Sequence, residues 1–237
     1  MNKHIAIALL LAGALLRTPG ADAAVPQKVQ AQYNLSVYGV PAAVMHETFE
    51  LQGNTYRIVS ETRAIGVLAL VQRRPGMLTS TGSVQRDGLR PHSFDGMRGT
   101  RDARKVHADF DWAAAELKLA HDGHNETVAL PAGTQDRLSA MYQFLFLAPE
   151  QLKNLSFAMT NGRKIDQYRY VIGPDTSLNT PLGAIAVIHL IKRHAADESA
   201  TEIWLARERN LLPVKMRIIE DDGDRYEQVI TKLEITP

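Results

Sequence analysis

Alternating hydrophobic and polar residues run through much of this chain. In residues 29–37, apolar side chains at the odd-numbered positions alternate with polar side chains at the even-numbered positions. This period of two is typical of a β-strand with one buried face and one solvent-facing face. Shorter runs of the same character begin at residue 56 and cover residues 202–205 and 214–218. The pattern therefore predicts a chain built mainly of strands.

Pairs of residues that favour tight turns separate these runs. An Asp or Asn followed by Gly tolerates the positive φ angles of two-residue hairpin turns. Such pairs occur at Asp87-Gly88, Asp122-Gly123, Asn161-Gly162 and Asp222-Gly223. Several of them between short alternating runs indicate an antiparallel meander.

One segment has helical spacing instead. Thr134 is a good N-cap, and Asp136 would lie in the first turn, where negative charge suits the helix dipole. Apolar side chains then follow at positions i, i+3, i+4 and i+7, namely Leu138, Met141, Tyr142 and Leu145. Pro149 would end the helix. The pattern predicts one main, mostly buried helix over about residues 135–147.

Two apolar runs are less distinctive. Residues 182–191 are rich in β-branched side chains, and their length permits a buried strand or a helix, of which we favour the strand. Residues 65–71 fit a buried strand or a short helix. Together the elements predict a mainly β, β-rich α+β domain. We expect a curved antiparallel sheet or near-closed barrel of about ten strands around the one helix.

The first 23 residues differ from the rest of the chain. A short positive start is followed by an apolar run of about 12 residues, too short to cross a bilayer, and then by the small-x-small sequence Ala21-Asp22-Ala23. This order is typical of a cleavable secretory signal peptide. We expect a signal peptide at residues 1–23, cleavage near Ala23, a single domain at residues 24–237, and a periplasmic location.

Composition narrows the function classes. The 237-residue chain has a formal net charge of +1, and removal of Lys3, Arg17 and Asp22 with the signal peptide leaves it neutral, which argues against nucleic-acid binding. It contains no cysteine, so it has neither disulfides nor the residue needed for lipoprotein anchoring. No later apolar run approaches 18 residues, so we expect no transmembrane anchor.

Several stretches together resemble the exported bacterial proteins of domain-of-unknown-function family 3108. They are DGLRP at residues 87–91, LPAGTQDRLS at 130–139, TPLG at 180–183, IWLA at 203–206 and LPVK at 212–215. The resemblance covers roughly residues 30–235. It implies a β-rich domain of the bacterial envelope, and it points to no particular activity. At the level of fold, the predicted plan is also loosely similar to the lipoprotein carriers of the LolA and LolB type.

Candidate chemical groups are few. The predicted helix carries Met141, Tyr142, Phe144 and Leu145, which could line an apolar ligand-binding pocket, although a core helix would look the same. His121 and His124 flank Asp122-Gly123, an arrangement that suits a metal site but suits an ordinary hairpin turn better. His189 lies in an apolar run and fits a hydrogen-bonded core residue. No motif indicates a catalytic residue, a metal site or a cofactor.

Three hypotheses follow from these features. The leading one is a non-enzymatic binder of an apolar ligand, such as a lipid or an acylated envelope component, in the concave side of the sheet. The second is a structural or interaction module that binds another envelope protein. The third, a hydrolase using Asp136 or the histidines, requires at least two titratable groups within hydrogen-bond reach in one cleft.

Overall fold

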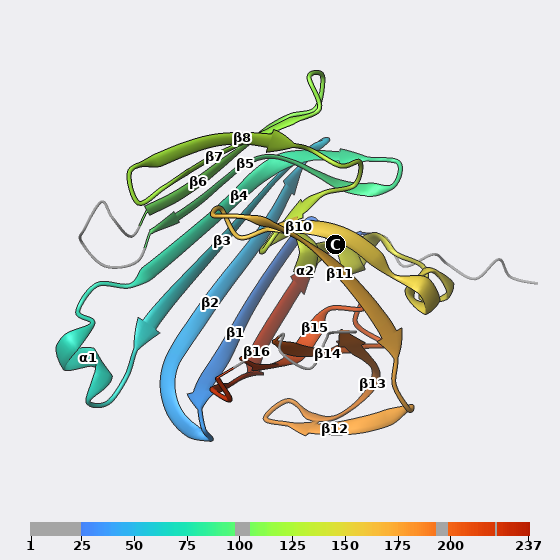
Figure 1. Ribbon diagram of the computed structural model, residues 1–237. Helices are drawn as coiled ribbons and strands as arrows, with labels where there is room; N and C mark the ends of the chain where they lie inside the picture. The colour runs from blue at the N-terminus through green and yellow to red at the C-terminus, as the bar shows by residue number, and fades with distance from the viewer. Residues whose placement is uncertain (1–24, 98–104, 193–198, 221) are drawn as a thin grey trace, which may run out of the picture.

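The computed structural model of the protein describes residues 25–97, 105–192, 199–220 and 222–237 (Figure 1). The expected signal peptide at residues 1–23 and its cleavage site near Ala23 lie outside the described residues. Among the described residues, no helix has the length and apolar character needed to span a bilayer.

Strands make up most of the described chain. The first half contains β1 (Lys28–Val37), β2 (Val40–Gln52), β3 (Thr55–Ala64), β4 (Gly76–Gln85), β5 (Gly88–Met97), β6 (Lys105–Asp111), β7 (Glu116–His121) and β8 (His124–Ala129). The second half contains β9 (Gln135–Asp136), β10 (Ser156–Thr160), β11 (Ile165–Ile172), β12 (Thr176–Thr180), β13 (Gly183–Lys192), β14 (Ala200–Ala206), β15 (Pro213–Ile219) and β16 (Arg225–Thr236). The helical segments are α1 (Leu68–Val71), α2 (Ser139–Gln143) and two 3-10 turns, η2 (Phe144–Phe146) and η3 (Pro149–Asn154).

The strands form one 16-stranded sheet, larger than the expected ten. Strands β1 to β8 follow one another as an antiparallel meander, and β1 also pairs with β16, so the first and last strands lie in the middle of the sheet. From β16 the order continues through β15, β14, β13, β11 and β10 to β9, with β12 paired to β13. Among the described strands, only the short β9–β10 pair is parallel. The predicted antiparallel, mainly β architecture is therefore confirmed.

The sheet curls but does not close into a barrel. Its two ends are β8 and the two-residue strand β9, which pairs with β10 and not with β8. In Figure 1, β10 and β11 cross in front of the concave face of the first half. The predicted near-closed barrel therefore does not form, because the second half of the sheet folds over the first half and does not pair with its edge strand.

The segment predicted as one main helix is divided into three. Residues 135–136 form β9, α2 is five residues long, and η2 follows as a single 3-10 turn. Thr134 is not an N-cap, because its hydroxyl donates to the carbonyl of Pro131 at 2.7 Å. The side chain of Asp136 accepts hydrogen bonds from the amides of Leu138 and Ser139, and α2 begins at Ser139, four residues beyond the expected start. The spacing of apolar residues predicts a helical segment, but it does not predict the residue at which the helix begins.

The interior of the curl is filled by side chains. A large cluster joins the concave face of the first half to the segment after β9, and includes Tyr33, Phe49, Phe94, Tyr142 and Leu145. A second cluster, which includes Phe144, Leu152, Leu190 and Ile203, lies between the second half of the sheet and the segments η2 and η3. Both clusters follow from the alternating pattern, because every second side chain of a strand faces the same side.

The local predictions had different outcomes. Residues 183–192 form a strand, as favoured, and the four predicted turns are hairpins with their glycines at positive φ. Residues 68–71 are a short helix, which was one of two alternatives for this run. This helix, α1, has no buried residue and protrudes from the sheet (Figure 1).

Candidate functional site

The four predicted ligand-binding residues lie in the interior and are divided between its two clusters. Tyr142 and Leu145 belong to the larger cluster, whereas Phe144 belongs to the smaller one. Met141 is partly buried and packs against both. The Tyr142 ring stacks on that of Phe49, with their centroids 5.2 Å apart. These residues therefore pack against the protein itself, and ligand binding by them stays a prediction.

A buried carboxyl group lies beside Tyr142. The Tyr142 hydroxyl donates to Oε2 of Glu47 at 3.3 Å, and Ser60 is the cross-strand neighbour of Glu47. Burial raises the pKa of Glu47 from 4.5 to about 7, and the hydroxyls of Ser60 and Tyr142 offset part of the increase. Glu47 is enclosed in the core, so it is a determinant of stability rather than a group available to a substrate.

A second buried carboxylate holds the α2 segment in place. Oδ1 of Asp136 accepts from the amides of Leu138 and Ser139 at 2.8 and 2.9 Å, and Oδ2 accepts from the Ser80 hydroxyl of β4 at 2.6 Å. Tyr56 of β3 extends the network through Ser80. Burial raises the pKa of Asp136, and these hydrogen bonds act against the increase. Asp136 is therefore a structural group that joins α2 to the first half of the sheet.

Two open hollows lie on the outer face of the first half. They are about 380 and 400 Å³ in volume, share His107, Ala120 and Asn125, and extend across β6, β7 and β8. The neighbouring rows Phe94, Ala108 and Leu119 face the core, so this surface is the opposite face of the sheet. We define the outer hollow as the surface lined by Asp95, His107, Asp109, Lys118, Asn125 and Thr127.

Ser93 of β5 lies beside Asp95 and His107 of the outer hollow, but the three residues are not in a catalytic order. Nδ1 of His107 lies 2.8 Å from Oδ1 of Asp95, and Ser93 donates to the other oxygen of Asp95 at 3.2 Å. A catalytic serine needs its hydrogen bond to the imidazole, which takes its proton. Here the Asp95 carboxylate lies between the Ser93 hydroxyl and the His107 imidazole. Among the described residues, no group of three or more potential metal ligands comes together.

Strand β8 bounds the outer hollow and is one edge of the sheet. It pairs with β7 on one side, and no described strand pairs with the other. The β7–β8 register runs without a bulge from Glu116–Ala129 to His121–His124. The sequence HNETVA contains neither proline nor lysine, the residues that commonly protect an exposed edge. This edge is therefore open to pairing with another extended chain.

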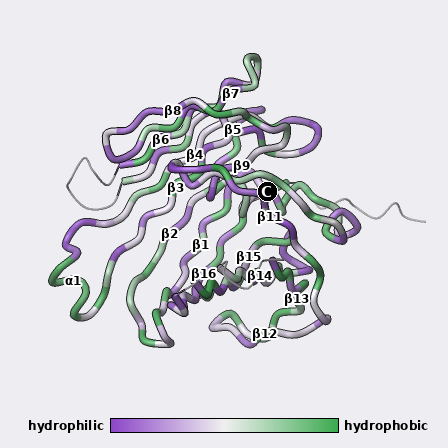
Figure 2. The backbone as a smooth tube through the Cα atoms, in the orientation of Figure 1, coloured by the Kyte–Doolittle hydropathy of each residue, from purple (hydrophilic) through white to green (hydrophobic). Residues whose placement is uncertain are grey.

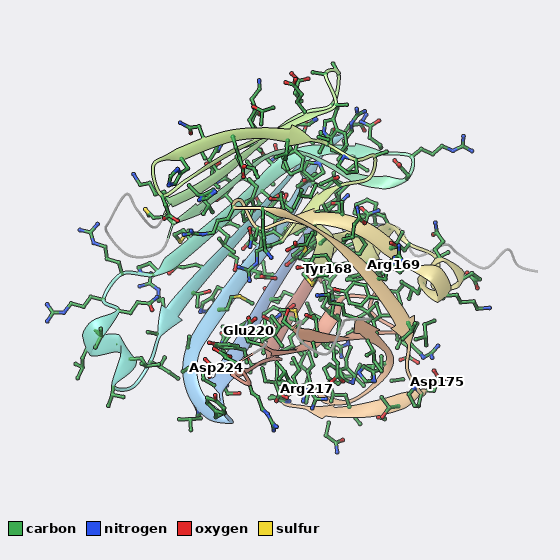
Figure 3. All side chains as sticks on the ribbon, in the orientation of Figure 1. Tyr168, Arg169, Asp175, Arg217, Glu220 and Asp224 are labelled. Atoms are coloured by element: carbon green, nitrogen blue, oxygen red, sulfur yellow. The ribbon has the colours of Figure 1, made fainter. Side chains whose placement is uncertain are left out.

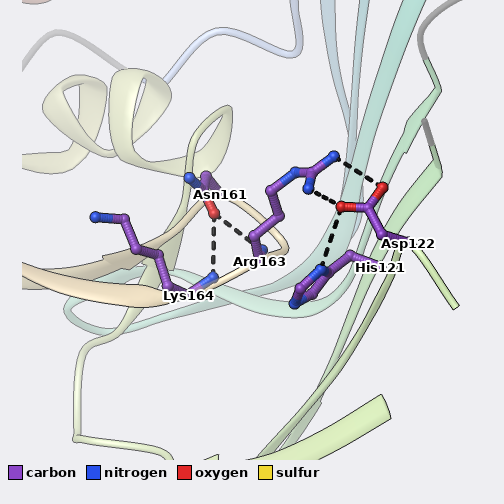
Figure 4. Close-up of polar contacts among 5 residues, drawn as sticks. All are labelled: His121, Asp122, Asn161, Arg163 and Lys164. Atoms are coloured by element: carbon purple, nitrogen blue, oxygen red, sulfur yellow. Dashed lines mark hydrogen bonds and ion pairs between the residues drawn. The ribbon is translucent and has the colours of Figure 1, made fainter. Parts of the chain in front are cut away.

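Two predicted hairpin turns meet where the halves of the sheet approach each other (Figure 4). In the β7–β8 turn, the carboxylate of Asp122 is ion-paired with Arg163 of the β10–β11 turn, and Nδ1 of His121 lies 3.6 Å from the same carboxylate. The hydrogen bond and charge of Arg163 lower the pKa of Asp122. Gly162, next to Arg163, packs against Val106 of β6. His121 and His124 thus belong to a structural turn, which confirms the hairpin interpretation of this motif.

This contact between the turns leads to a first prediction. A Cβ atom at Gly162 would lie 2.8 Å from Cβ of Val106, and Gly162 has a φ of 86°. The Gly162→Ala variant would therefore be strained both by this contact and by its backbone conformation. We expect it to lower the free energy of unfolding by about 2 kcal/mol, measured by urea denaturation. Arg163→Ala should leave the denaturation midpoint nearly unchanged, because exposed ion pairs contribute little. A larger decrease in the free energy of unfolding for Arg163→Ala than for Gly162→Ala would contradict this prediction.

The second half of the sheet has its own polar group around Trp204. The ring of His189 stacks on that of Trp204 at 4.4 Å, and its Nε2 lies 2.7 Å from Oε2 of Glu202. Arg217, labelled in Figure 3, also binds Glu202, and its guanidinium lies over the Trp204 ring. His189 is therefore a hydrogen-bonded part of the sheet, as interpreted from the apolar run around it.

The fold and the site define a large, open, mainly β domain with a polar outer hollow and a free edge strand. The model of the family described as "Protein of unknown function (DUF3108)" matches residues 32–231, and the chain therefore belongs to this family. The resemblance found in the sequence motifs is thereby confirmed.

Two solved structures are similar to this chain. A candidate lipoprotein from Parabacteroides distasonis has 10% sequence identity and a TM-score of 0.38, over 88% of this chain and 97% of its own. A candidate exported protein with a YmcC-like fold from Bacteroides fragilis has 10% identity and a TM-score of 0.36, over 88% and 96%. No protein with a curated description matched the chain. The expected likeness to LolA- and LolB-type carriers stays a prediction.

Proposed function

We propose that this protein is a non-enzymatic interaction module of the periplasm that binds an extended segment of a partner protein along β8. The observation that carries the proposal is the free edge of β8, with a continuous register and no proline, lysine or bulge to protect it. An extended peptide can add to such an edge through main-chain hydrogen bonds. Pockets beside the edge then select the peptide's side chains.

The outer hollow supports this mode of binding. Asn125 and Thr127 of β8 point to the same face as Ala120 and Lys118 of β7, their cross-strand neighbours. Every second side chain of an added strand would therefore face the hollow. The hollow carries both charges, from Asp109 and Lys118, so it suits a polar segment better than an acyl chain.

The interior supports an interaction module more than a carrier of an apolar ligand. Tyr142 and Phe144 are each only 1% exposed, and both pack against the protein's own side chains. An acyl chain in the concave side would have to displace these contacts. Two observations support a non-enzymatic role. Asp95 lies between Ser93 and His107, so these residues do not form a serine–imidazole pair, and Asp136 is buried and has a structural role.

Site-specific crosslinking tests the proposal. A photoreactive amino acid at Thr127, introduced in the cells that make the protein, is expected to crosslink one partner protein. The matched control is Thr55, an exposed threonine at the start of β3, a strand paired on both sides. The double variant Thr127→Lys/Ala129→Lys should weaken binding of the identified partner by about tenfold or more, because edge lysines oppose strand addition.

Hydrogen exchange provides the second measurement. With the purified partner bound, amides of β8 should gain protection while those of β3 do not change. Equal crosslinking from Thr127 and Thr55, or a bound complex in which β8 amides exchange as before, would count against an edge-strand site.

A further inference from the structure

A second exposed surface lies at the loop between β3 and β4. Residues 65–74, which we call the α1 loop, leave the sheet after β3 and contain the helical turn α1 (Figure 1). The turn is ordered by backbone hydrogen bonds, including the amide of Gln72 to the carbonyl of Leu68 at 2.8 Å. None of the four residues of α1 is buried by the rest of the described chain.

The α1 loop presents apolar side chains to solvent. The exposed fraction is 79% for Val67, 73% for Leu70 and 87% for Val71, and Leu68 is also exposed. Figure 2 shows this protruding loop with hydrophobic colouring. A cluster of exposed large aliphatic residues on one turn is unfavourable in water unless the cluster binds something.

The loop itself carries net positive charge. Arg73 and Arg74 follow α1 directly, are exposed, and form no ion pair with the described residues. Arg63 at the end of β3 is ion-paired with Glu61, whereas no acidic residue occurs between residues 62 and 86, so Arg73 and Arg74 give the loop its positive charge. This local positive charge contrasts with the near-neutral chain as a whole. The loop is thus complementary to an anionic surface.

The small size of the apolar cluster favours lipid over protein as the occupant. A stable protein interface buries about 1,200–2,000 Å² in total, which needs far more than one helical turn. Insertion into a membrane interface needs only a few apolar side chains, with basic residues that bind the anionic headgroups. A single protruding turn also matches a flat lipid surface without a complementary groove.

We propose that the α1 loop docks the protein on an anionic phospholipid surface. Leu70 and Val71 insert at the level of the acyl chains, and Arg73 and Arg74 lie against the lipid phosphates. This site is separate from β8, so a partner segment and a membrane can be bound at the same time. The docking does not depend on the proposed edge-strand function.

Vesicle flotation tests this proposal. The purified protein is expected to float with vesicles of phosphatidylethanolamine and phosphatidylglycerol, and not with vesicles of phosphatidylcholine. The variants Leu70→Asp/Val71→Asp and Arg73→Glu/Arg74→Glu should each reduce binding by about tenfold or more, and concentrated salt should weaken binding of the parent protein. All four positions are exposed, so the unfolding midpoints should stay unchanged.

Val40 provides the matched control. It is 65% exposed at the neighbouring β1–β2 turn, where Tyr38 is hydrogen-bonded to Asp224 and the local charge is acidic. The Val40→Asp variant should therefore bind anionic vesicles as the parent protein does. The proposal is overturned if the parent protein does not float with anionic vesicles, or if Val40→Asp lowers binding as much as Leu70→Asp/Val71→Asp does. It is also overturned if the loop crosslinks a protein while vesicle binding is absent.

Discussion

Replacing Asp136 with alanine is expected to lower the free energy of unfolding by about 4 kcal/mol. The carboxylate accepts hydrogen bonds from the Ser80 hydroxyl and from the amides of Leu138 and Ser139, all of them buried. Alanine leaves three donors without acceptors and without access to water, and each such group costs about 1–3 kcal/mol. Urea denaturation monitored by circular dichroism measures the loss.

The matched variant is Asp136→Asn. Its carbonyl oxygen can still accept from the two amides, and its amino group can donate to the Ser80 hydroxyl, which then donates to Tyr56. We expect less than half of the loss seen with alanine. Because burial raises the pKa of Asp136, the folded protein tolerates a neutral side chain there. Equal losses for the two variants would show that the negative charge, and not hydrogen bonding, holds α2 to the sheet.

Glu47→Gln is expected to stabilise the protein above neutral pH by about 3 kcal/mol. The folded protein keeps the proton of Glu47 up to about pH 7, whereas the unfolded chain releases it near the ordinary pKa of 4.5. Between these values the folded state binds more protons than the unfolded state. The free energy of unfolding therefore falls as the pH rises from about 4.5 to about 7, and the loss is complete above that range.

Glutamine has the shape of the protonated acid and does not ionise, so it removes this pH-dependent loss. Denaturation midpoints of the parent protein and Glu47→Gln should be close at pH 4 and separate progressively toward pH 8. The control is Glu50→Gln in the same strand, because the Glu50 carboxylate is half-exposed in an ion pair with Lys28 and should contribute little. A constant difference between parent and Glu47→Gln at all pH values would contradict ionisation of Glu47 as the cause.

The structural role of these two carboxyl groups was only partly visible in the sequence. Asp136 lies before an apolar helical run, so its place at a helix start was predicted, but its partner Ser80 is 56 residues away. Glu47 lies in a strand whose alternation assigns it to the inner face, yet nothing local indicates that Tyr142 covers it, 95 residues later. Contacts between distant segments are set by how the sheet folds over, which local patterns do not encode.

The outer hollow and the free edge were missed for a related reason. His107 belongs to no sequence motif, and its partner Asp95 is 12 residues before it in a different strand. Their pairing requires the antiparallel β5–β6 register, which no local pattern around either residue indicates. The apolar run at residues 65–71 marks the α1 loop in the sequence, but the same run is equally compatible with a buried strand. Only its position beyond the end of the sheet shows that it is exposed.

The sequence alone determined the elements whose cause is local. Strands follow from side-chain alternation, hairpins from Asp-Gly and Asn-Gly pairs, and the family from short motifs, because each depends on neighbours within a few residues. The tertiary structure decided the 16-stranded open sheet, the shortening of the predicted helix to α2, and the distribution of buried and exposed apolar runs. These depend on which distant surfaces meet, and burial of a residue is a property of the whole fold.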